Sequence, residues 1–496
     1  MNTAHDQTHI DTSLFSPRFQ WRNPNTRRKR QMRYAIGLFA LTSATAFAQA
    51  SASSSLTITT TACAGGTQYA AYSGCTIAAS GGTPPYTFSW SASQSYGSLP
   101  EGMSLNASTG AIASSQIGGQ GTYGVQFIVT DASNSTATQN ISFGITGNNA
   151  FLISIFPGNS IFHHRMDYAT TGLPVDTSPA APIYSGYLPE TIKPFFGNAS
   201  AGAPNGIPAF EVPCSQAHVP VTTVTGGYQH YFTSGPIPPN APIEGTSNNS
   251  NATNYIGDGH VLIYQQGRCS NVTPGLWEMF TSQLVAGGAW EDDSNALWPN
   301  VDSNALTPQG KGTADAAGLP IAPLLLNADE VIGTGTPTSP NGTVRHPTRF
   351  TLNHMLNNWV WPATETAGVG SCTGVPIETL ISQSSPPSAC SFSAPAGEIY
   401  RLKASVANPA CTANSPQAAI IIRGLRHFGI ILADNGDSGG LIGTPDTRWN
   451  DNDLSCLRNL TLADFEPVNV SSLMISKDSG KTAADAEVRP SNREPR

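Results

Sequence analysis

Apolar and polar residues alternate over many short segments of this chain, and turns rich in Gly, Pro, Asn and Ser separate these segments. The alternation is clear at residues 86–90, 121–131 and 139–143. A period of two is typical of strands that bury one face, and short strands at this spacing indicate a sandwich of two sheets. We therefore predict a β-sandwich over residues 55–148.

Residues 150–475 predict a second, larger domain that is β-rich, of sandwich or jelly-roll type. Its expected strands are residues 259–265, 275–280, 348–352, 358–361 and 398–405. One C-terminal helix is expected over residues 415–433, where apolar positions follow helical spacing, with Gly429 distorting its end. The polar residues 476–496 predict a disordered tail. The predicted fold class is therefore mainly β.

The N-terminal region has the three parts of a secretory signal. A basic run begins at Arg27, an apolar stretch follows, and small residues stand at cleavage spacing before Ala48 and again before Ala50. We expect residues 1–48 to be leader and signal peptide, with both cleavage frames open. The apolar stretch is shorter than the roughly twenty residues that a membrane span requires, and no later segment is long enough. The mature chain is therefore expected outside the cell or on its surface, with no membrane span.

The composition narrows the possible partners. Charged residues make up 11% of the chain, the net charge is −8, and Gly (48) and Pro (38) are abundant. An acidic chain of this kind does not favour a nucleic-acid partner. The composition says nothing of oligomeric state.

The eight cysteines indicate disulfides, because an even number in an oxidising compartment favours pairing. Cys63 and Cys75 are close enough to join one hairpin, and Cys372 with Cys390 would close a short loop. No Cys-x-x-Cys or His-x-x-x-His pair indicates zinc, so we predict no metal and no cofactor. Three pairings are open for the remaining four, which are Cys214, Cys269, Cys411 and Cys456.

Four separated motifs carry a resemblance in the sandwich region. They are residues 81–90, 99–105, 108–112 and 121–131. In this order they resemble the Ig-like (cadherin-like) repeats of bacterial secreted and surface proteins. The resemblance implies a spacer, adhesion or glycan-contact module without catalytic residues. Cadherin-like domains ligate calcium through aspartates such as Asp131, but the flanking acidic ligands are missing here, so we expect a solvated turn aspartate.

The large domain carries a second resemblance, to a family of uncharacterised secreted bacterial proteins. The residues that carry it are 241–245, 258–262, 276–278, 302–306, 313–320, 361–363, 401–404, 432–436 and 446–449. The resemblance supports the architecture and export, and it brings no assigned activity. Within one of these blocks we select Asp434 and Asn435 as ligand-binding candidates.

Acid–base chemistry has four candidate residues in the large domain. Asp258 and His260 alternate on one expected strand and share a face. If that strand pairs with the next, His260 and Glu278 could form an acid/base pair; alternatively, His260 is a hydrogen-bonded core residue. Asp302, like the ligand-binding candidate Asp315, lies in a segment without clear periodicity. Such residues carry function on loops, and they also simply build turns.

Cations on the expected strands suggest a site for a carboxylate-bearing ligand, because Arg binds carboxylates with two parallel bonds. The ligand-binding candidates here are Arg349, Arg401 and Lys403, with Arg345 and His354 nearby in the sequence. Residues 400–404 are loosely similar to a strand motif of jelly-roll alginate lyases. The alternative is that these cations pair with surface acids.

Six tryptophans add an aromatic component, and sugar rings stack on exposed aromatic faces. We select Trp361 as a ligand contact, while core packing is the expected role for most of the six. The set is Trp277, Trp290, Trp298, Trp359, Trp361 and Trp449.

Residues 436–440 read Gly-Asp-Ser-Gly-Gly, the sequence around the nucleophile of chymotrypsin-like proteases. The resemblance covers these five residues only, and His163 and His164 lack the context of that family's catalytic histidine. We expect the motif to follow a helix, with Gly436 as its C-terminal cap. A protease with Ser438 as nucleophile is therefore the third hypothesis.

Two hypotheses of different classes precede it. In the first, the large domain binds, and in some versions cleaves, an extracellular polysaccharide. A hydrolase would use Glu278 with Asp258 or Asp302, whereas a lyase would place His260 and basic residues around a uronate. In the second, the chain is a non-enzymatic adhesion or interaction protein that binds a cell-surface ligand.

Overall fold

A computed structural model gives the fold of most of the chain. It describes residues 54–91, 99–167, 173–178, 181–183, 185–198, 205–224, 230–245, 257–267, 272–368 and 394–483. The expected signal peptide and the expected Cys372–Cys390 pair lie outside the described residues. Within them, no helix combines the length and apolar character needed to cross a membrane.

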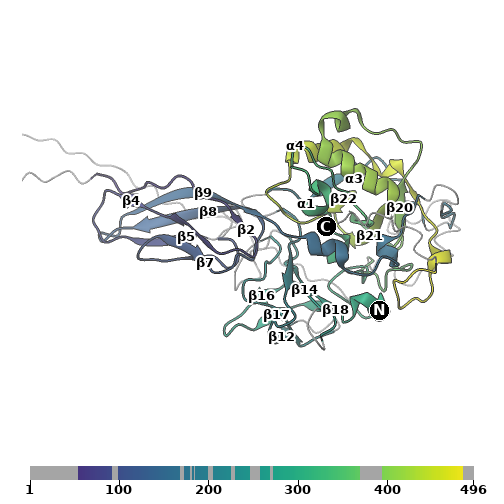
Figure 1. Cartoon of the computed structure of the whole chain (residues 1–496), viewed down its shortest axis with the longest axis horizontal. Helices are drawn as coiled ribbons and strands as arrows, with labels where there is room; N and C mark the ends of the chain where they lie inside the picture. Colours follow the sequence, from purple (N-terminus) through teal and green to yellow (C-terminus); the bar gives the residue numbers. More distant parts are fainter. Residues whose placement is uncertain are drawn as a thin grey trace, which may run out of the picture. The chain divides into compact units, whose positions relative to one another are not determined.

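The first module is a β-sandwich, as its alternating pattern predicts (Figure 1). The longest strand, β8 (Gly121–Thr130), alternates between buried and half-buried residues along its whole length, so one face turns into the core. That core includes Phe127, Phe143 and Ile112. One sheet has the strand order β2 (Gly66–Thr67), β9 (Thr136–Thr146), β8, β5 (Thr87–Ser91). The other sheet has the order β3 (Tyr72–Thr76), β7 (Ala111–Ser114), β6 (Ser104–Leu105). In addition, β1 (Thr57–Ile58) pairs with β4 (Ala79–Ser80).

Two local features of the module can be compared with the sequence prediction. Cys63 and Cys75 form the predicted disulfide. The Asp131 carboxylate accepts hydrogen bonds from the backbone N–H groups of Thr83, Ser133 and Ser135. These bonds lower the pKa of Asp131. Asp131 is therefore a turn-building residue, but it is 5% exposed rather than solvated, and one of its hydrogen bonds comes from Thr83 in a distant segment.

A six-stranded mixed sheet forms the centre of the large domain. Its strands, in order, are β10 (Lys193–Phe195), β22 (Gly440–Ile442), β19 (Thr348–Leu352), β21 (Ile430–Asn435), β20 (Ile399–Leu402) and β23 (Phe465–Pro467). The neighbours β19 and β21 run parallel. Every residue of β19 is buried, as expected for a strand with neighbours on both sides and cover on both faces.

Two four-stranded sheets complete the domain. One has the order β11 (Ala209–Val212), β14 (Val261–Gln265), β15 (Gly275–Phe280), β18 (Ser294–Trp298); the other has β13 (Ser234–Gly235), β12 (Val219–Thr223), β17 (Trp290–Asp292), β16 (Gln283–Leu284). Alternate residues of β14 and β15 enter different cores. Leu262 and Leu276 join the main core, whereas Ile263 and Met279 join a smaller one. Because both faces are covered, these strands are apolar almost throughout.

The C-terminal helix is shorter than predicted. α3 spans Pro416–His427 and contacts β20 (Figure 1), but residues 430–435 are strand β21 rather than helix. Gly429, at φ +81°, allows the chain to turn between them. The apolar run had satisfied helical spacing, and burial of Ile430–Ala433 between β19 and β20 decided the strand.

Short helices occupy the connections. The α-helices are α1 (Ala328–Ile332) and α4 (Asp451–Leu454), and the 3-10 helices are η1 (Ala150–Ser154), η2 (Ile161–His163), η4 (Val301–Ser303), η5 (Ala322–Leu324), η8 (Ala410–Asn414), η9 (Ser455–Asn459), η10 (Leu462–Asp464) and η11 (Ser471–Leu473). The predicted strand at 358–361 is reduced to an isolated bridge from Trp359 to Ala396.

The described part of the predicted tail is ordered. Lys481 bridges to Ser160, and Ser479 bridges to Ala305. The domain therefore continues to residue 483, because polar residues here satisfy their backbone groups against the fold.

Candidate functional site

A loop before β14 presents two of the predicted residues. Gly259 has φ +67°, a turn that exposes Asp258 while His260 is buried. The Glu244 carboxylate accepts hydrogen bonds from the backbone N–H groups of Asp258 (3.1 Å) and His260 (3.4 Å). Glu244 thus fixes the backbone from which both side chains project.

Arg349 links two acidic residues from separate parts of the chain. It lies on β19, and its Nη2 is 2.9 Å from Asp315 Oδ1 and 3.3 Å from Asp434 Oδ2. Because β19 is the direct neighbour of β21, Arg349 reaches Asp434 near the carboxyl end of β21. The two carboxylates are therefore brought close together by one cation.

Asp315 is itself held rigidly. Its Oδ2 accepts hydrogen bonds from the backbone N–H groups of Ala317 (3.1 Å) and Leu319 (3.0 Å). Its side chain is fully buried, whereas that of Asp434 is 21% exposed. Asp315 therefore orients Arg349, and Asp434 is the member of the trio that a ligand can reach.

Two connected hollows lie over these residues, and we call them together the acidic cavity. Their volumes are about 480 and 290 Å³, and their walls share Asp258, His260 and Asp434. A volume of this size falls within the range of ligand-binding pockets. The first hollow is also lined by Asp315 and Glu365, and the second by the set Glu244, Arg349, Asn205 and Asn435.

Burial changes the protonation of several of these groups. It raises the pKa of Asp434 to about 7; the Arg349 guanidinium opposes this rise, and the charge of Asp315 adds to it. Burial likewise raises the pKa of Glu244 to about 8 and that of Glu365 to about 7. Protonated carboxyl groups are thus available in the cavity near neutral pH.

His260 is a neutral, hydrogen-bonded residue. Burial lowers its pKa to about 4, even though Asp258 favours the charged form. Its Nδ1 lies 3.2 Å from the backbone oxygen of Met279, and its ring packs 5.6 Å, between centroids, from that of Phe280. His260 therefore combines the buried environment of a core histidine with a place in the cavity wall.

The expected pairing of the strands that carry His260 and Glu278 is present. β14 and β15 are antiparallel with Leu262 opposite Glu278, so His260 and Glu278 share one face of the sheet. Glu278 nevertheless accepts hydrogen bonds from the backbone N–H groups of Ile321 and Ala322. It is fully buried and lines neither hollow. Its carboxylate anchors the start of η5.

Besides Glu278, four predicted site residues lie outside the walls of the acidic cavity. Asp302 is exposed on η4. Arg401 pairs with Glu466 at 2.8 Å and donates to the backbone oxygen of Met166. The remaining two also donate to backbone oxygens: Lys403 Nζ to Ala463 O, and Trp361 Nε1 to Ser479 O.

The tryptophans mostly serve the core, as expected. Those at 277, 290, 298 and 449 are buried. The aromatic residues in the walls of the acidic cavity are instead Phe280 and Phe195, both half-buried.

Gly436–Gly439 connect β21 to β22, so the motif follows a strand and the prediction of a helix cap at Gly436 is wrong. The Ser438 Oγ accepts a hydrogen bond from the backbone N–H of Asn353 at 3.0 Å. Among the described residues, no recorded hydrogen bond joins Ser438 to a histidine. The hydroxyl of this serine therefore makes a structural contact with the backbone of Asn353.

Sequence reasoning missed Glu244 and Glu365. Both are single glutamates in irregular segments, where no periodicity marks a buried face. Glu365 accepts a hydrogen bond from the Gly312 backbone N–H, while its Oε1 has no hydrogen-bond partner. Only the fold brings these loops to Asp258 and Asp434.

Comparisons with known proteins supply no family. No protein-family model matches the chain, and no curated protein matches it. Neither bacterial family that the sequence resembles is therefore shown.

Some solved structures match short parts of the chain. Mouse cadherin-23 EC22-24 is 14% identical, with a TM-score of 0.16, over 19% of this chain and 31% of that one. Drosophila N-cadherin EC1-4 is 11% identical, with a TM-score of 0.16, over 20% of this chain and 26% of that one. The chain thus spans less than a third of these cadherin fragments, and similarity this low carries no argument about function.

Proposed function

We propose that this chain is an exported protein that binds a neutral extracellular polysaccharide in the acidic cavity and hydrolyses its glycosidic bonds. Asp434 would act as the general acid, and Asp258 would be the second carboxylate. The observation that carries the proposal is that Asp258, His260 and Asp434 line both hollows of one cavity. Glycoside hydrolysis requires two carboxyl groups that flank the scissile bond.

The two aspartates differ in the way that acid and base roles require. Asp434 is mostly buried against Arg349 and has its pKa raised to about 7. Asp258 is exposed at the loop before β14, where its carboxylate meets solvent. Carboxyl groups whose environments differ in this way can divide the acid and base roles.

The charge of the cavity favours a hydrolase over a lyase. Five carboxyl groups line its walls, against one arginine. That arginine, Arg349, already contacts Asp315 and Asp434. An anionic uronate would therefore find no cation without a carboxylate partner, whereas a neutral sugar would meet carboxyl groups that hydrogen-bond its hydroxyls.

The other wall residues suit a sugar ring. Phe280 and Phe195 offer apolar faces, and Asn205 and Asn435 offer amide groups. Sugars present both apolar C–H surfaces and hydroxyl groups, so a mixed wall of this kind complements them.

The adhesion alternative would favour a broad exposed aromatic patch. Among the described residues, the exposed large hydrophobic side chains are Val175, Val224, Met474 and Ile475, and none is aromatic. We therefore assign the sandwich module the role of presenting the large domain, with chemistry in the acidic cavity.

Release of reducing ends from a panel of neutral and uronate-containing polysaccharides tests the proposal. We expect activity on a neutral member, and its loss in Asp434→Asn and in Asp258→Asn. Asp437→Asn is the matched control, because Asp437 is exposed three positions away and lines neither hollow. Activity on uronate polymers alone, or full activity in both cavity variants, would overturn it.

A further inference from the structure

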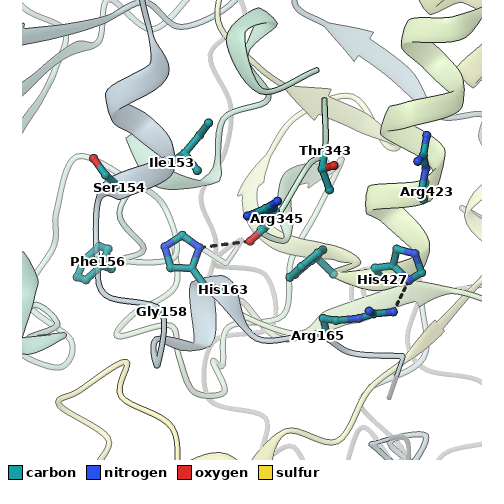
Figure 2. Close-up of a pocket in the computed structure, with 11 residues that line it drawn as sticks. Ile153, Ser154, Phe156, Gly158, His163, Arg165, Thr343, Arg345, Arg423 and His427 are labelled. Atoms are coloured by element: carbon teal, nitrogen blue, oxygen red, sulfur yellow. Dashed lines mark hydrogen bonds between the residues drawn. The ribbon is translucent and has the colours of Figure 1, made fainter. Parts of the chain in front are cut away.

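A separate cavity of about 550 Å³ lies among η1, η2 and the end of α3 (Figure 2). We call it the cationic cavity. Its wall contains Ile153, Ser154, Phe156, Gly158, His163, Arg165, Thr343, Arg345, Arg423, His427 and Phe428. Three arginines and two histidines face it without one acidic residue in the wall, in a chain whose net charge is −8.

A carboxylate outside the wall neutralises part of this positive charge. Asp167, which is not in the wall, accepts two hydrogen bonds from Arg165 at 2.9 Å each. It also lies 2.5 Å from Nδ1 of His427. Asp167 therefore holds Arg165 and His427 in place and balances the charge of Arg165.

Arg345 and Arg423 carry no such partner. Figure 2 shows both at the cavity, and no dashed line reaches either guanidinium. Within the described part of the chain, neither side chain has a recorded ion pair or hydrogen bond, and both residues are exposed. Arg423 and His427 are one helical turn apart on α3, so they share a face.

A bound anion would relieve the electrostatic repulsion between these cations. Like charges around one hollow repel each other, and a carboxylate or phosphate between them replaces the repulsion with charge-assisted hydrogen bonds. The wall also contains the apolar side chains of Ile153, Phe156 and Phe428, beside Ser154 and Thr343. The wall thus complements a molecule that has one anionic end and an apolar body.

We propose that the cationic cavity is a second ligand site, which binds a small organic anion with its carboxylate or phosphate between Arg345 and Arg423. Its apolar body would lie against Phe156 and Phe428. No residue of the acidic cavity lines this site. The inference therefore does not depend on glycoside hydrolysis.

Calorimetric titration of the full chain tests it, with phenyl phosphate, benzoate and the neutral benzyl alcohol as probes. We expect at least one anion to bind about tenfold or more tightly than the alcohol, because the alcohol lacks the charge-assisted bonds. Tighter binding of phenyl phosphate identifies a phosphate site, and tighter binding of benzoate identifies a carboxylate site.

Variants distinguish binding in the cationic cavity from nonspecific attraction of anions to surface arginines. Arg345→Gln and Arg423→Gln should each weaken the preferred anion about fivefold or more, and the double variant should abolish its binding. Arg458→Gln, at an exposed arginine outside the cavity, should leave binding unchanged. Asp434→Asn should also leave it unchanged while it removes hydrolysis. Equal binding of all three probes, or unaltered binding in the double variant, would overturn the inference.

Discussion

Nη2 of Arg349 lies 2.9 Å from Oδ1 of Asp315, and neither side chain is more than 2% exposed. The pair joins β19 to the loop before η5, and the same nitrogen lies 3.3 Å from Asp434. Nε and Nη1 of Arg349 are buried without a hydrogen-bond partner. The position of Asp434 in the acidic cavity thus depends on a buried charge that is only partly satisfied by protein.

Arg349→Met should destabilise the protein by about 3–5 kcal/mol, because removing one partner leaves a buried charge uncompensated. Equilibrium unfolding in guanidinium measures the loss. Adding Asp315→Asn to this variant should recover part of it, since the stranded carboxylate is then removed. Arg458→Met, at an exposed position, should change the unfolding free energy by less than about 0.5 kcal/mol. A loss for Arg349→Met no larger than that of the control would contradict the role of the pair.

Hydrolysis should decline as the pH rises above about 7. Asp434 must be protonated to act as the acid, and its pKa is raised to about 7. Asp434→Asn should lower kcat by about 100-fold or more, the usual contribution of general acid catalysis. The pH profile of kcat measures the decline above pH 7. Kinetics at a single pH measure the loss of kcat in Asp434→Asn, with Asp437→Asn as the unaffected control. A rate that is flat from pH 6 to pH 9 would exclude Asp434 as the acid.

Glu398 should make the fold less stable as the pH rises. Burial, followed by repulsion from Asp176, raises its pKa from 4.5 to about 9. Between these values the folded state keeps a proton that the unfolded state releases, so this contribution weakens with increasing pH across the window. Thermal unfolding from pH 5 to pH 9 should show that the melting temperature of Glu398→Gln rises relative to that of the wild type as the pH rises. Hydrolysis should be the same in both proteins. Parallel curves for the two proteins would contradict this.

The Cys411–Cys456 disulfide should contribute about 4 kcal/mol, since it closes a loop with a sequence separation of 45. The double Ser variant should lose that amount in equilibrium unfolding. Replacing Cys63 and Cys75, whose separation is 12, should remove about 3 kcal/mol. Reduction of the wild type should cost at least this combined loss, because it also breaks the disulfide of Cys214 and the expected Cys372–Cys390 pair. If the shorter loop proved the more stabilising, the loop-entropy explanation would be wrong for this protein.

Export should remove the basic and apolar leader. We expect N-terminal sequencing of protein secreted from an expressing bacterium to begin at Gln49 or Ser51, after one of the two small-residue frames. Replacing Ala48 with a bulky charged residue should block both products, because Ala48 is a small-residue position of both frames. An uncut chain that stays in the cytoplasm would contradict both the leader prediction and an extracellular substrate.

The local alternation of apolar and polar residues was sufficient to predict a strand where one face of that strand is buried. Strand β8 alternates so regularly that its burial followed from the sequence. Strands β15 and β19 were predicted with their observed bounds. Residues 430–435 were not, because an apolar run buried on both sides has no period that separates helix from strand. Neighbouring strands decided its conformation.

The candidate site likewise has a part that the local sequence predicts and a part that only the tertiary structure decides. The sequence by itself selected Asp258 and His260, but the strand alternation expected to place them on one face is absent, because β14 begins at Val261 and Gly259 turns the chain at φ +67°. It could not bring Asp434 to Arg349, which are 85 positions apart, or add Glu244 to them. Parallel pairing of β19 with β21 did so, and burial then shifted the pKa of Asp434. Residue type and local spacing are written in the chain, whereas proximity between distant segments and the exclusion of water arise only when the sheets assemble.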